Sequence, residues 1–127
     1  EILGTGVDIV ENLRIKKSLE NKQFISRIFS SNEILLSKKF KNKTNYYSKR
    51  FAAKEAFAKS IGTGFRDGLN FKDVSIINNK LGKPSFLITD KLKKIVKRQF
   101  KTSSFNFFLS ISDEKKYSVA LVILQKN

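Results

Sequence analysis

The 127-residue sequence contains no cysteine, histidine, methionine or tryptophan. The lack of cysteine excludes disulfides and is expected of a cytoplasmic protein. Without histidine or cysteine, the chain cannot form a Ser-His-Asp triad, a thiolate nucleophile or the usual zinc ligand sets. Any bound metal must therefore be held by oxygen atoms. This favours Mg²⁺ on one or two carboxylates, with water and a substrate phosphate completing its shell.

Long hydrophobic runs are also absent. The longest, near Val119 to Leu124, has the length of a strand and falls far short of the ~20 residues of a membrane-spanning helix. The first ten residues have neither a basic segment nor a small-residue cleavage site, so no signal peptide is expected. We expect one domain spanning residues 1–127, with a single core and no membrane contact.

Acidic residues are scarce, since 11 Asp and Glu stand against 26 Lys and Arg, a formal net charge of +15. One interpretation is a polyanionic partner, such as nucleic acid, an acidic protein or a phosphorylated ligand. The other is compositional drift, because nearly all the basic residues are lysine and much Asn, Ile and Phe accompanies them. The composition leaves both interpretations open.

The N-terminal part of the chain predicts a strand followed by helical segments. Residues 2–10 are rich in strand-forming types, and Gly4 and Gly6 indicate that another backbone approaches closely there. Residues 12–28 carry basic and apolar positions at roughly helical spacing.

Capping patterns predict two further helices. Ser30 followed by Glu33 is a capping box, which opens a helix expected to run to about Phe40. A second helix is expected over residues 44–61, and Gly62 is a plausible end for it.

The remainder of the chain predicts strands, turns and one more helix. These elements are a loop over 62–70, short strands within 74–78 and 85–88, a helix over 90–99 capped by Thr89, and a hairpin of strands 104–112 and 117–124. The predicted fold class is therefore α+β, an antiparallel sheet packed against helices.

The stretch RFAAKEAFAKS, residues 50–60, places a carboxylate inside a helix built for close packing. Glu55 and Lys59 are four residues apart and lie on one face, so a surface ion pair is one interpretation. The alanines around Glu55 allow another group to approach its backbone, and a carboxylate beside a tight contact is usually paired or ligating.

A second carboxylate, Asp8, interrupts an apolar strand in GTGVDIVENLRI. By itself it can be a solvent-facing residue at a strand end, and Gly-Thr-Gly lacks the full dinucleotide fingerprint. Taken together, Asp8 and Glu55 could clamp one Mg²⁺ against a phosphate. The glycine-rich turns GTGFRDG and NKLGKP are either phosphate cradles or ordinary turns.

Three blocks, GTGVDIVENLRI, RFAAKEAFAKSIGTG and LGKP, occur in an order and spacing that resembles the bacterial holo-(acyl-carrier-protein) synthases. These are the small class of 4′-phosphopantetheinyl transferases. The closing LSISDEKKYSVALVIL is similar to the last hairpin of that family, so the resemblance spans nearly the whole chain.

The resemblance implies a 4′-phosphopantetheinyl transferase fold and activity. The phosphopantetheine arm of coenzyme A would move to a serine of acyl carrier protein, in support of fatty acid biosynthesis. Asp8 and Glu55 match the family's Mg²⁺-binding carboxylates, and Lys59 matches a lysine that meets the coenzyme A phosphates. The implied catalytic residues are therefore Asp8, Glu55 and Lys59.

The resemblance also implies a homotrimer with active sites between subunits. Gly82, Lys83 and Pro84 would wall the nucleotide from the neighbouring chain. Further candidates for contact with coenzyme A are Arg50, Lys54, Gly62 and Gly64. The carrier protein's acidic helix would dock on Arg14 and the basic helix after it, where the candidate residues are Arg14, Lys17, Lys22, Phe24 and Arg27.

Two points are open from the sequence. The base that accepts the serine proton could be Asp8, Glu55 or a metal-bound water. Asp113 stands where many relatives have histidine and others aspartate, and an anion there does not favour a phosphate-binding role.

Two other functions are compatible with parts of the sequence. A small basic nucleic-acid-binding protein fits the charge and the Lys-rich segments 38–43 and 91–101. It would need exposed aromatic residues, whereas Phe105, Phe107 and Phe108 lie in the most apolar hairpin and are typical of a core; no nucleic acid is therefore expected. The third is a coenzyme A-binding protein without activity.

Overall fold

The computed structural model describes all residues, 1–127. Its elements are, in chain order, β1 (Ile2–Glu11), α1 (Asn12–Ser18), α2 (Lys22–Ile28), α3 (Ser31–Ser37), α4 (Lys43–Ile61), the 3₁₀ helix η1 (Phe71–Asp73), β2 (Ile76–Asn78), β3 (Pro84–Phe86), α5 (Asp90–Phe100), β4 (Phe105–Asp113) and β5 (Tyr117–Lys126). The predicted α+β class is confirmed.

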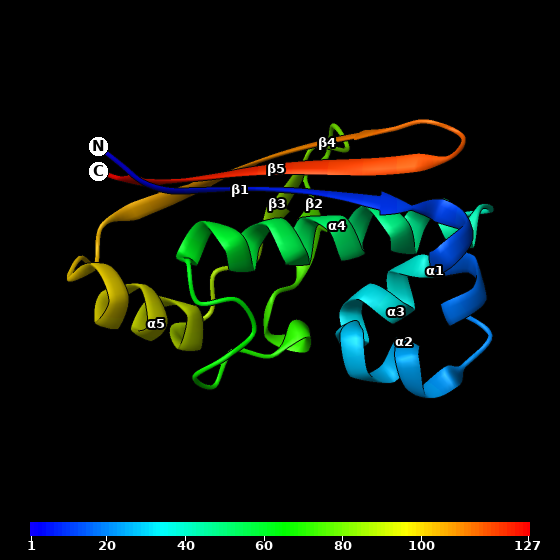
Figure 1. Cartoon of the computed structure of the whole chain (residues 1–127), viewed down its shortest axis with the longest axis horizontal. Helices are drawn as coiled ribbons and strands as arrows, with labels where there is room; N and C mark the ends of the chain where they lie inside the picture. The colour runs from blue at the N-terminus through cyan, green and yellow to red at the C-terminus, as the bar shows by residue number, and fades with distance from the viewer.

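The main sheet has three antiparallel strands in the order β1-β5-β4. Figure 1 shows these strands running along one side of the molecule, with α4 beneath them and nearly parallel to them. The helices α1, α2 and α3 gather at one end of α4, and α5 lies at the other. The two termini lie side by side, since β1 and β5 pair along their length and Lys126 N–H donates to Glu1 C=O at 2.8 Å.

Helix α4 is the centre of the core. Twelve of its 19 residues are buried, because it is covered by the sheet on one side and by α3, η1 and the segment before β2 on another. Small residues face the sheet, where Ala52, Ala53 and Ala56 have no exposed surface. Phe57 fills the space toward the second, smaller sheet and stacks on Phe107 with 4.5 Å between ring centroids.

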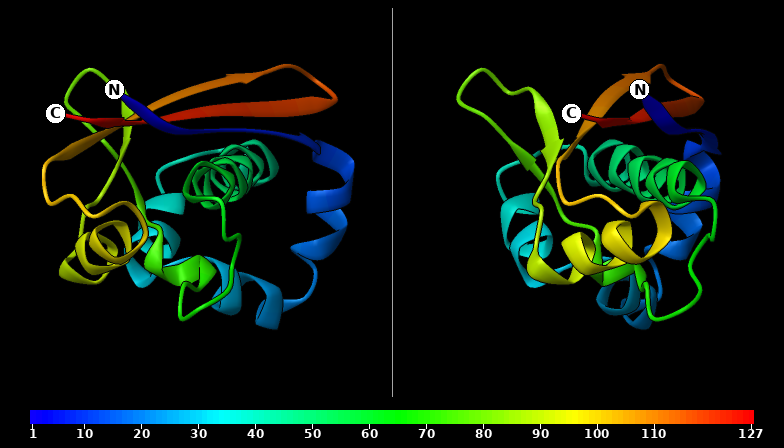
Figure 2. Two further views of the ribbon diagram at one scale, coloured as in Figure 1. Left: turned by 60° about the vertical axis from the view of Figure 1, so that its left-hand side comes forward. Right: turned by 90° about the vertical axis from the view of Figure 1, so that its left-hand side faces the viewer.

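Strands β2 and β3 form a separate two-stranded antiparallel sheet. Figure 2 shows the end of this hairpin projecting away from the main body. Ile76 and Phe86 are buried at that base, whereas residues 77–83 at the tip are exposed.

Several local predictions are confirmed by the caps. Ser30 and Glu33 form the capping box of α3, and the Thr89 hydroxyl accepts a hydrogen bond from Leu92 N–H at the start of α5. Gly62 ends α4 with φ +92°, a left-handed conformation that glycine adopts without strain.

The predicted extents of two helical segments are wrong. Residues 12–28 form two short helices, because the Asn21 side chain accepts from Gln23 N–H and starts a new helix there. The helix that begins after Ser30 ends at Ser37, where the Lys43 ammonium donates to the Ser37 and Phe40 carbonyls and closes the turn. No helix of the chain has an apolar stretch of the length that spans a bilayer.

Candidate active site

Two glycines allow β1 to lie directly on α4. A Cβ atom on Gly4 would come 1.9 Å from the Ser60 carbonyl oxygen, and one on Gly6 would come 1.9 Å from that of Ala56. The close backbone approach predicted for these glycines is therefore confirmed. Two strand residues advance about 6.6 Å and four helix residues about 6.0 Å, so the two elements stay in step.

The same register brings the two candidate carboxylates together. Asp8 follows Gly6 on the face of β1 that lies on α4, and its Oδ1 is 3.2 Å from the Nζ of Lys59, one helical turn beyond Glu55. The Asp8 carboxylate is one of the causes that raise the pKa of Glu55, so the two groups lie close enough to repel. The strand and the helix thus bring together two acidic residues that are far apart in the sequence.

Partial burial is the main cause of the raised pKa values of both Asp8 and Glu55. For Asp8, a hydrogen bond from Lys59 and the charges of Lys59 and Arg14 act in the opposite direction. The charges of Lys59 and Arg14 also oppose the shift at Glu55. Two half-buried carboxylates that repel each other form a site that favours a bound cation.

Lys59 pairs with Asp8, not with Glu55. Its Nζ lies 3.2 Å from Asp8 Oδ1 and donates to the Val7 carbonyl at 3.0 Å. The surface ion pair along the helix is therefore not the arrangement found. The Lys59 side chain is 54% exposed, which leaves its ammonium accessible to an incoming anion.

The carboxylate pair fits a Mg²⁺ ion that keeps most of its shell for other ligands. No group of three or more His, Cys, Asp or Glu side chains is placed to hold a metal ion. The protein thus offers two carboxylates, a set that suits Mg²⁺ completed by water and substrate phosphate.

A separate pocket brings together three other predicted residues. Arg50, Gly82 and Pro84 line a cavity of about 540 Å³, which also contains Asn78 and Asp113. Lys83 is exposed in the same turn.

This pocket and the carboxylates lie on different sides of α4. Arg50 and Lys59 are nine residues apart, which is two and a half helical turns and about 14 Å along the axis. The two residues therefore point in opposite directions. None of Asp8, Glu55 and Lys59 lines the pocket.

Lys54 is in an environment that does not suit ligand binding. It has no exposed surface, and its Nζ lies 2.6 Å from Glu33 Oε1. The same ammonium donates to the Phe71 carbonyl at 2.9 Å and to the Val74 carbonyl. Burial lowers the pKa of Lys54, and the Glu33 charge opposes that shift. The sequence-based prediction of a coenzyme A contact overlooked this burial, because Lys54 and Glu55 are adjacent in the motif but face different sides of the helix.

Gly62 and Gly64 follow the C-terminal end of α4. Both have positive φ values, +92° and +66°, and the Gly62 N–H bonds to the Ala58 carbonyl at 3.2 Å. The C-terminal end of a helix carries a partial negative charge, which disfavours a phosphate. The ordinary-turn interpretation of GTGFRDG therefore agrees better with their position.

Comparison with known proteins gives a consistent assignment. Residues 4–122 match the 4′-phosphopantetheinyl transferase superfamily. The chain is 75% identical over 126 residues to a holo-[acyl-carrier-protein] synthase of Pelagibacter ubique, covering 99% of this chain and 98% of that protein. The chain belongs to the holo-(acyl-carrier-protein) synthase family. It is therefore an enzyme, a transferase, and the resemblance of its motifs to this family is confirmed.

Solved structures of the family share its fold. The holo-[acyl-carrier-protein] synthase of Neisseria meningitidis superposes with a TM-score of 0.90 at 38% identity, covering 99% of this chain and 100% of that chain. A synthase of Bacillus anthracis, solved in complex with CoA (3′,5′-ADP), gives a TM-score of 0.82 at 34% identity, covering 99% and 98%.

Family membership also bears on the nucleic-acid alternative, which the structure does not support. Phe107 packs in the core against Phe57 and Phe86, as expected. Phe105 is half-buried, and only Phe108 is exposed, at 49%. The other exposed aromatic residues, Phe40 and Tyr117, follow α3 and begin β5, so the exposed rings are scattered over separate elements and do not form the row of aromatic platforms that such a protein needs.

The predicted docking residues fall on α1 and α2. The four cations, Arg14, Lys17, Lys22 and Arg27, are exposed. Phe24 is half-buried and packs against Phe29 and Phe51, with ring centroids 6.2 and 6.1 Å apart, so only part of its ring is accessible. Arg14 is also near enough to the carboxylate pair to lower the pKa of both acids.

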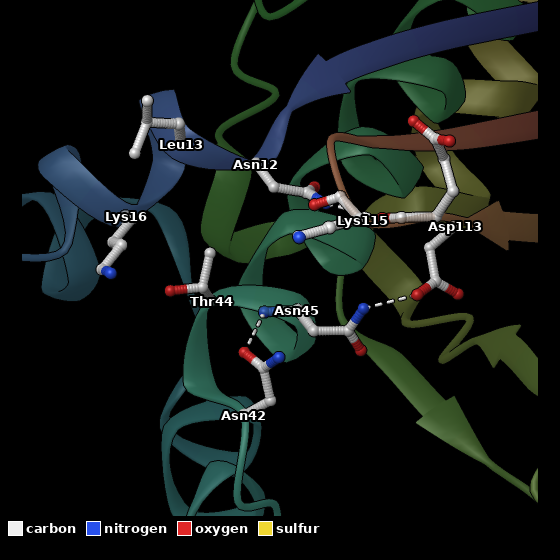
Figure 3. Close-up of a pocket in the computed structure, with 9 residues that line it drawn as sticks. Asn12, Leu13, Lys16, Asn42, Thr44, Asn45, Asp113 and Lys115 are labelled. Carbon is white, nitrogen blue, oxygen red and sulfur yellow. Dashed lines mark hydrogen bonds between the residues drawn. The ribbon is translucent and has the colours of Figure 1, made fainter.

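Asp113 lies at the end of β4, exposed, between two cavities. Figure 3 shows Asn45 Nδ2 donating to Asp113 Oδ2, at 2.5 Å, across the pocket of about 670 Å³ between α1, the start of α4 and the β4–β5 turn. Asp113 also lines the pocket that contains Arg50. Its carboxylate is thus held in place at the rim of both.

Three residues have structural roles that the sequence did not reveal. Glu33 was identified only as a cap, whereas its carboxylate also contacts Lys54 and Ile76 N–H. Asn78 joins Arg50 to the Gly82 carbonyl. Asn12 holds the β4–β5 turn by donating to the Glu114 and Lys115 carbonyls. The contacts of Glu33 with Lys54, of Arg50 with Asn78 and of Asn12 with the β4–β5 turn join elements that only the tertiary fold brings together.

Proposed function

We propose that this enzyme transfers the 4′-phosphopantetheine group of coenzyme A to a serine of an apo acyl carrier protein, in support of fatty acid biosynthesis. The serine oxygen forms a bond to phosphorus while the phosphorus–oxygen bond of the pyrophosphate breaks. The products are the holo carrier protein and adenosine 3′,5′-bisphosphate. The observation that carries the proposal is the convergence of Asp8 and Glu55 beside Lys59.

Asp8 and Glu55 would hold Mg²⁺, which when bound neutralises the charge of the pyrophosphate. Lys59 lies at the edge of the same site, and its half-exposed side chain can bring a second positive charge to the pyrophosphate. Binding a phosphate oxygen would draw Lys59 away from the Asp8 carboxylate. Catalysis by this chain is therefore mainly positioning and charge stabilisation.

The serine proton needs an acceptor, and the chain has no histidine. Asp8 and Glu55 are the carboxylates of this site and the candidate acceptors among the protein groups, alongside a water of the metal's shell.

The carrier protein would dock on the exposed cations of α1 and α2. Arg14 adjoins both the docking surface and the carboxylate pair, so a carrier held there would bring its serine close to the phosphate. Opposite charges on the two proteins would speed their encounter and make it sensitive to salt. On this proposal, part of the +15 charge is functional.

A homotrimer would complete the site. Asp8 and Glu55 lie on one side of α4 and the Arg50–Pro84 pocket on another. One coenzyme A molecule would therefore contact the carboxylates of one chain and the hairpin of its neighbour. The outer face of the main sheet also needs a cover, since it exposes Val7, Ile9, Phe108 and Leu121 by 43–63%. The cytoplasmic location expected from the cysteine-free sequence stays a prediction.

The test is to incubate the enzyme with coenzyme A, Mg²⁺ and an apo acyl carrier protein and to weigh the carrier by mass spectrometry. We expect the carrier to gain one phosphopantetheine group, and to gain none when EDTA replaces Mg²⁺. An unchanged carrier mass, together with measurable coenzyme A binding, would indicate a binding protein without activity and reject the transferase proposal.

A further inference from the structure

The β2–β3 hairpin meets the main sheet by packing at its base, where the Phe86 and Phe107 ring centroids lie 5.9 Å apart, and not by strand pairing. The hairpin has only three residue pairs and forms no strand pairing with β1, β5 or β4. A two-stranded hairpin is marginally stable on its own. Its buried anchors, Ile76 and Phe86, lie at the base, and its tip projects from the body (Figure 2).

The shape of the tip is set locally by Asn79. Its side-chain oxygen accepts from Leu81 N–H and Lys83 N–H, both at 2.9 Å, and its N–H donates to the Lys83 carbonyl at 3.0 Å. Gly82 completes the turn with φ +86°. These contacts fix the turn itself but not its position relative to α4.

Asn78 connects the tip to α4. Arg50 Nη2 donates to Asn78 Oδ1 at 2.7 Å, and Asn78 Nδ2 donates to the Gly82 carbonyl at 3.0 Å. The oxygen of the Asn78 amide therefore bonds to the helix, and its nitrogen bonds to the turn that contains the LGKP motif.

Arg50 in turn contacts Tyr46 and Glu33. Its guanidinium lies 4.0 Å from the centroid of the Tyr46 ring, and its Nε is 3.9 Å from Glu33 Oε2. Glu33 is 1% exposed, and its carboxylate is fixed by Lys54 at 2.6 Å and by the N–H groups of Ser30 and Ile76 at 3.0 and 3.2 Å. The Arg50 Nε makes no hydrogen bond, so the arginine that bonds Asn78 is held by stacking on Tyr46 and by the charge of this fixed anion.

We propose that Asn78 is a positioning residue, which transmits the fixed orientation of Glu33 and Arg50 to Gly82, Lys83 and Pro84. The chain Glu33–Arg50–Asn78–Gly82 presets the nucleotide-facing edge of the hairpin before the ligand arrives. The part concerning coenzyme A rests on the proposed function, whereas the part concerning the hairpin does not.

The first test measures the hairpin without ligand. Hydrogen exchange of residues 79–83 is compared in the wild-type enzyme, Asn78→Ala and a matched control, Asn32→Ala, whose asparagine is exposed on α3. We expect exchange at the tip to rise about tenfold or more in Asn78→Ala alone. Wild-type exchange in Asn78→Ala would overturn the proposal.

A second variant tests the link to Gly82. Asn78→Asp keeps an oxygen acceptor for Arg50 but loses the donor to the Gly82 carbonyl. We expect hydrogen exchange of residues 79–83 to stay raised in this variant, because the connection between α4 and the turn needs both hydrogen bonds of Asn78. If Asn78→Asp exchanges like the wild type, the proposed route through Gly82 is wrong.

Steady-state kinetics tests the purpose of the positioning. In Asn78→Ala we expect the KM for coenzyme A to rise about 5- to 30-fold with kcat changed less than about twofold, since ground-state binding is affected. A raised KM with wild-type exchange would mean that Asn78 contacts the ligand directly, and raised exchange with an unchanged KM would mean that the hairpin does not serve the nucleotide. Either result would overturn the proposal. Failure of the wild-type enzyme to modify any carrier would reject the transferase and leave the exchange result to decide the hairpin part.

Discussion

Helix α4 carries two clusters in which a carboxylate meets a lysine, and they differ in how completely their charges are satisfied. In the first, Lys54 is fully buried and contacts Glu33 and two backbone carbonyls. In the second, Lys59 is 54% exposed and contacts Asp8, while Glu55 stands beside them with a raised pKa. The first cluster has no capacity left for a ligand, whereas the second has excess negative charge and an accessible cation.

The difference shows how two lysines in one motif take separate roles. Lys54 and Lys59 are five residues apart, so they point about 140° apart around the helix. One enters the interior, where an unpaired charge would be costly and full pairing is required. The other reaches the surface beside β1, where incomplete pairing is tolerated and is useful for binding anions and cations.

The largest expected effect is on activity. Glu55→Gln keeps the shape of the side chain but removes the charge that we assign to Mg²⁺ binding. We expect the transfer rate to fall by about 10³-fold or more, with the fold retained. Carrier modification measured by mass spectrometry and circular dichroism of the variant check this. Glu11→Gln, an exposed carboxylate on β1, is the matched control. Substantial activity in Glu55→Gln would contradict the metal role.

The buried cluster should respond in stability. Glu33→Gln leaves the Lys54 ammonium buried without its counter-ion, which should lower the free energy of unfolding by about 3–5 kcal/mol. Urea denaturation measures the change. Adding Lys54→Met should recover part of the loss, because the unpaired charge is then gone. If Glu33→Gln alone leaves stability unchanged, the contrast between the two clusters is wrong.

A smaller effect is expected where β1 meets α4. Gly6→Ala places a Cβ atom 1.9 Å from the Ala56 carbonyl oxygen, a backbone atom that cannot move without the helix. We expect a loss of about 1–3 kcal/mol in the free energy of unfolding, together with reduced transfer because Asp8 is displaced from Glu55. Thr5→Ala, at the exposed neighbouring position of β1, should change neither stability nor activity appreciably.

The smallest effect concerns pH. The pKa of Glu55 is higher in the folded protein than in the unfolded chain. At pH values between the two, the folded protein therefore binds more protons, and the free energy of unfolding falls as the pH rises through this range. Glu55→Gln lacks this loss. Without divalent ions at pH 7, it should be more stable than the wild type by less than about 1 kcal/mol, because the group is partly exposed.

Thermal unfolding at several pH values checks this difference. The advantage of Glu55→Gln should disappear below about pH 4, where the wild-type carboxyl is protonated in both states. Added Mg²⁺ should stabilise the wild type and not the variant. A variant that is less stable than the wild type at pH 7 would show that Glu55 is already compensated within the protein.

Much of the fold follows from local patterns in the sequence. The caps at Ser30, Gly62 and Thr89 and the strand pair of β4 and β5 were predicted correctly, because each depends on residues close together in the chain. The extents of the short helices were predicted less well, since their ends depend on contacts such as that of Lys43 with the end of α3.

For the site, the sequence identified Asp8, Glu55 and Lys59 as candidates, and Gly4 and Gly6 as the place where a second backbone comes close. It could not show that Lys59 pairs with Asp8, 51 residues away. Motif spacing also cannot tell which side chain of an adjacent pair enters the core, as with Lys54 and Glu55.

The amino-acid sequence by itself therefore determined the family, the types of the elements and the exclusion of histidine and cysteine chemistry. Only the tertiary structure decided which charged side chains are paired inside the protein and which are left accessible at the surface. The reason is that the cost of an unpaired charge depends on burial, and burial is a property of packed elements. Glu33 shows this most clearly, since its partner Ile76 N–H lies 43 residues away.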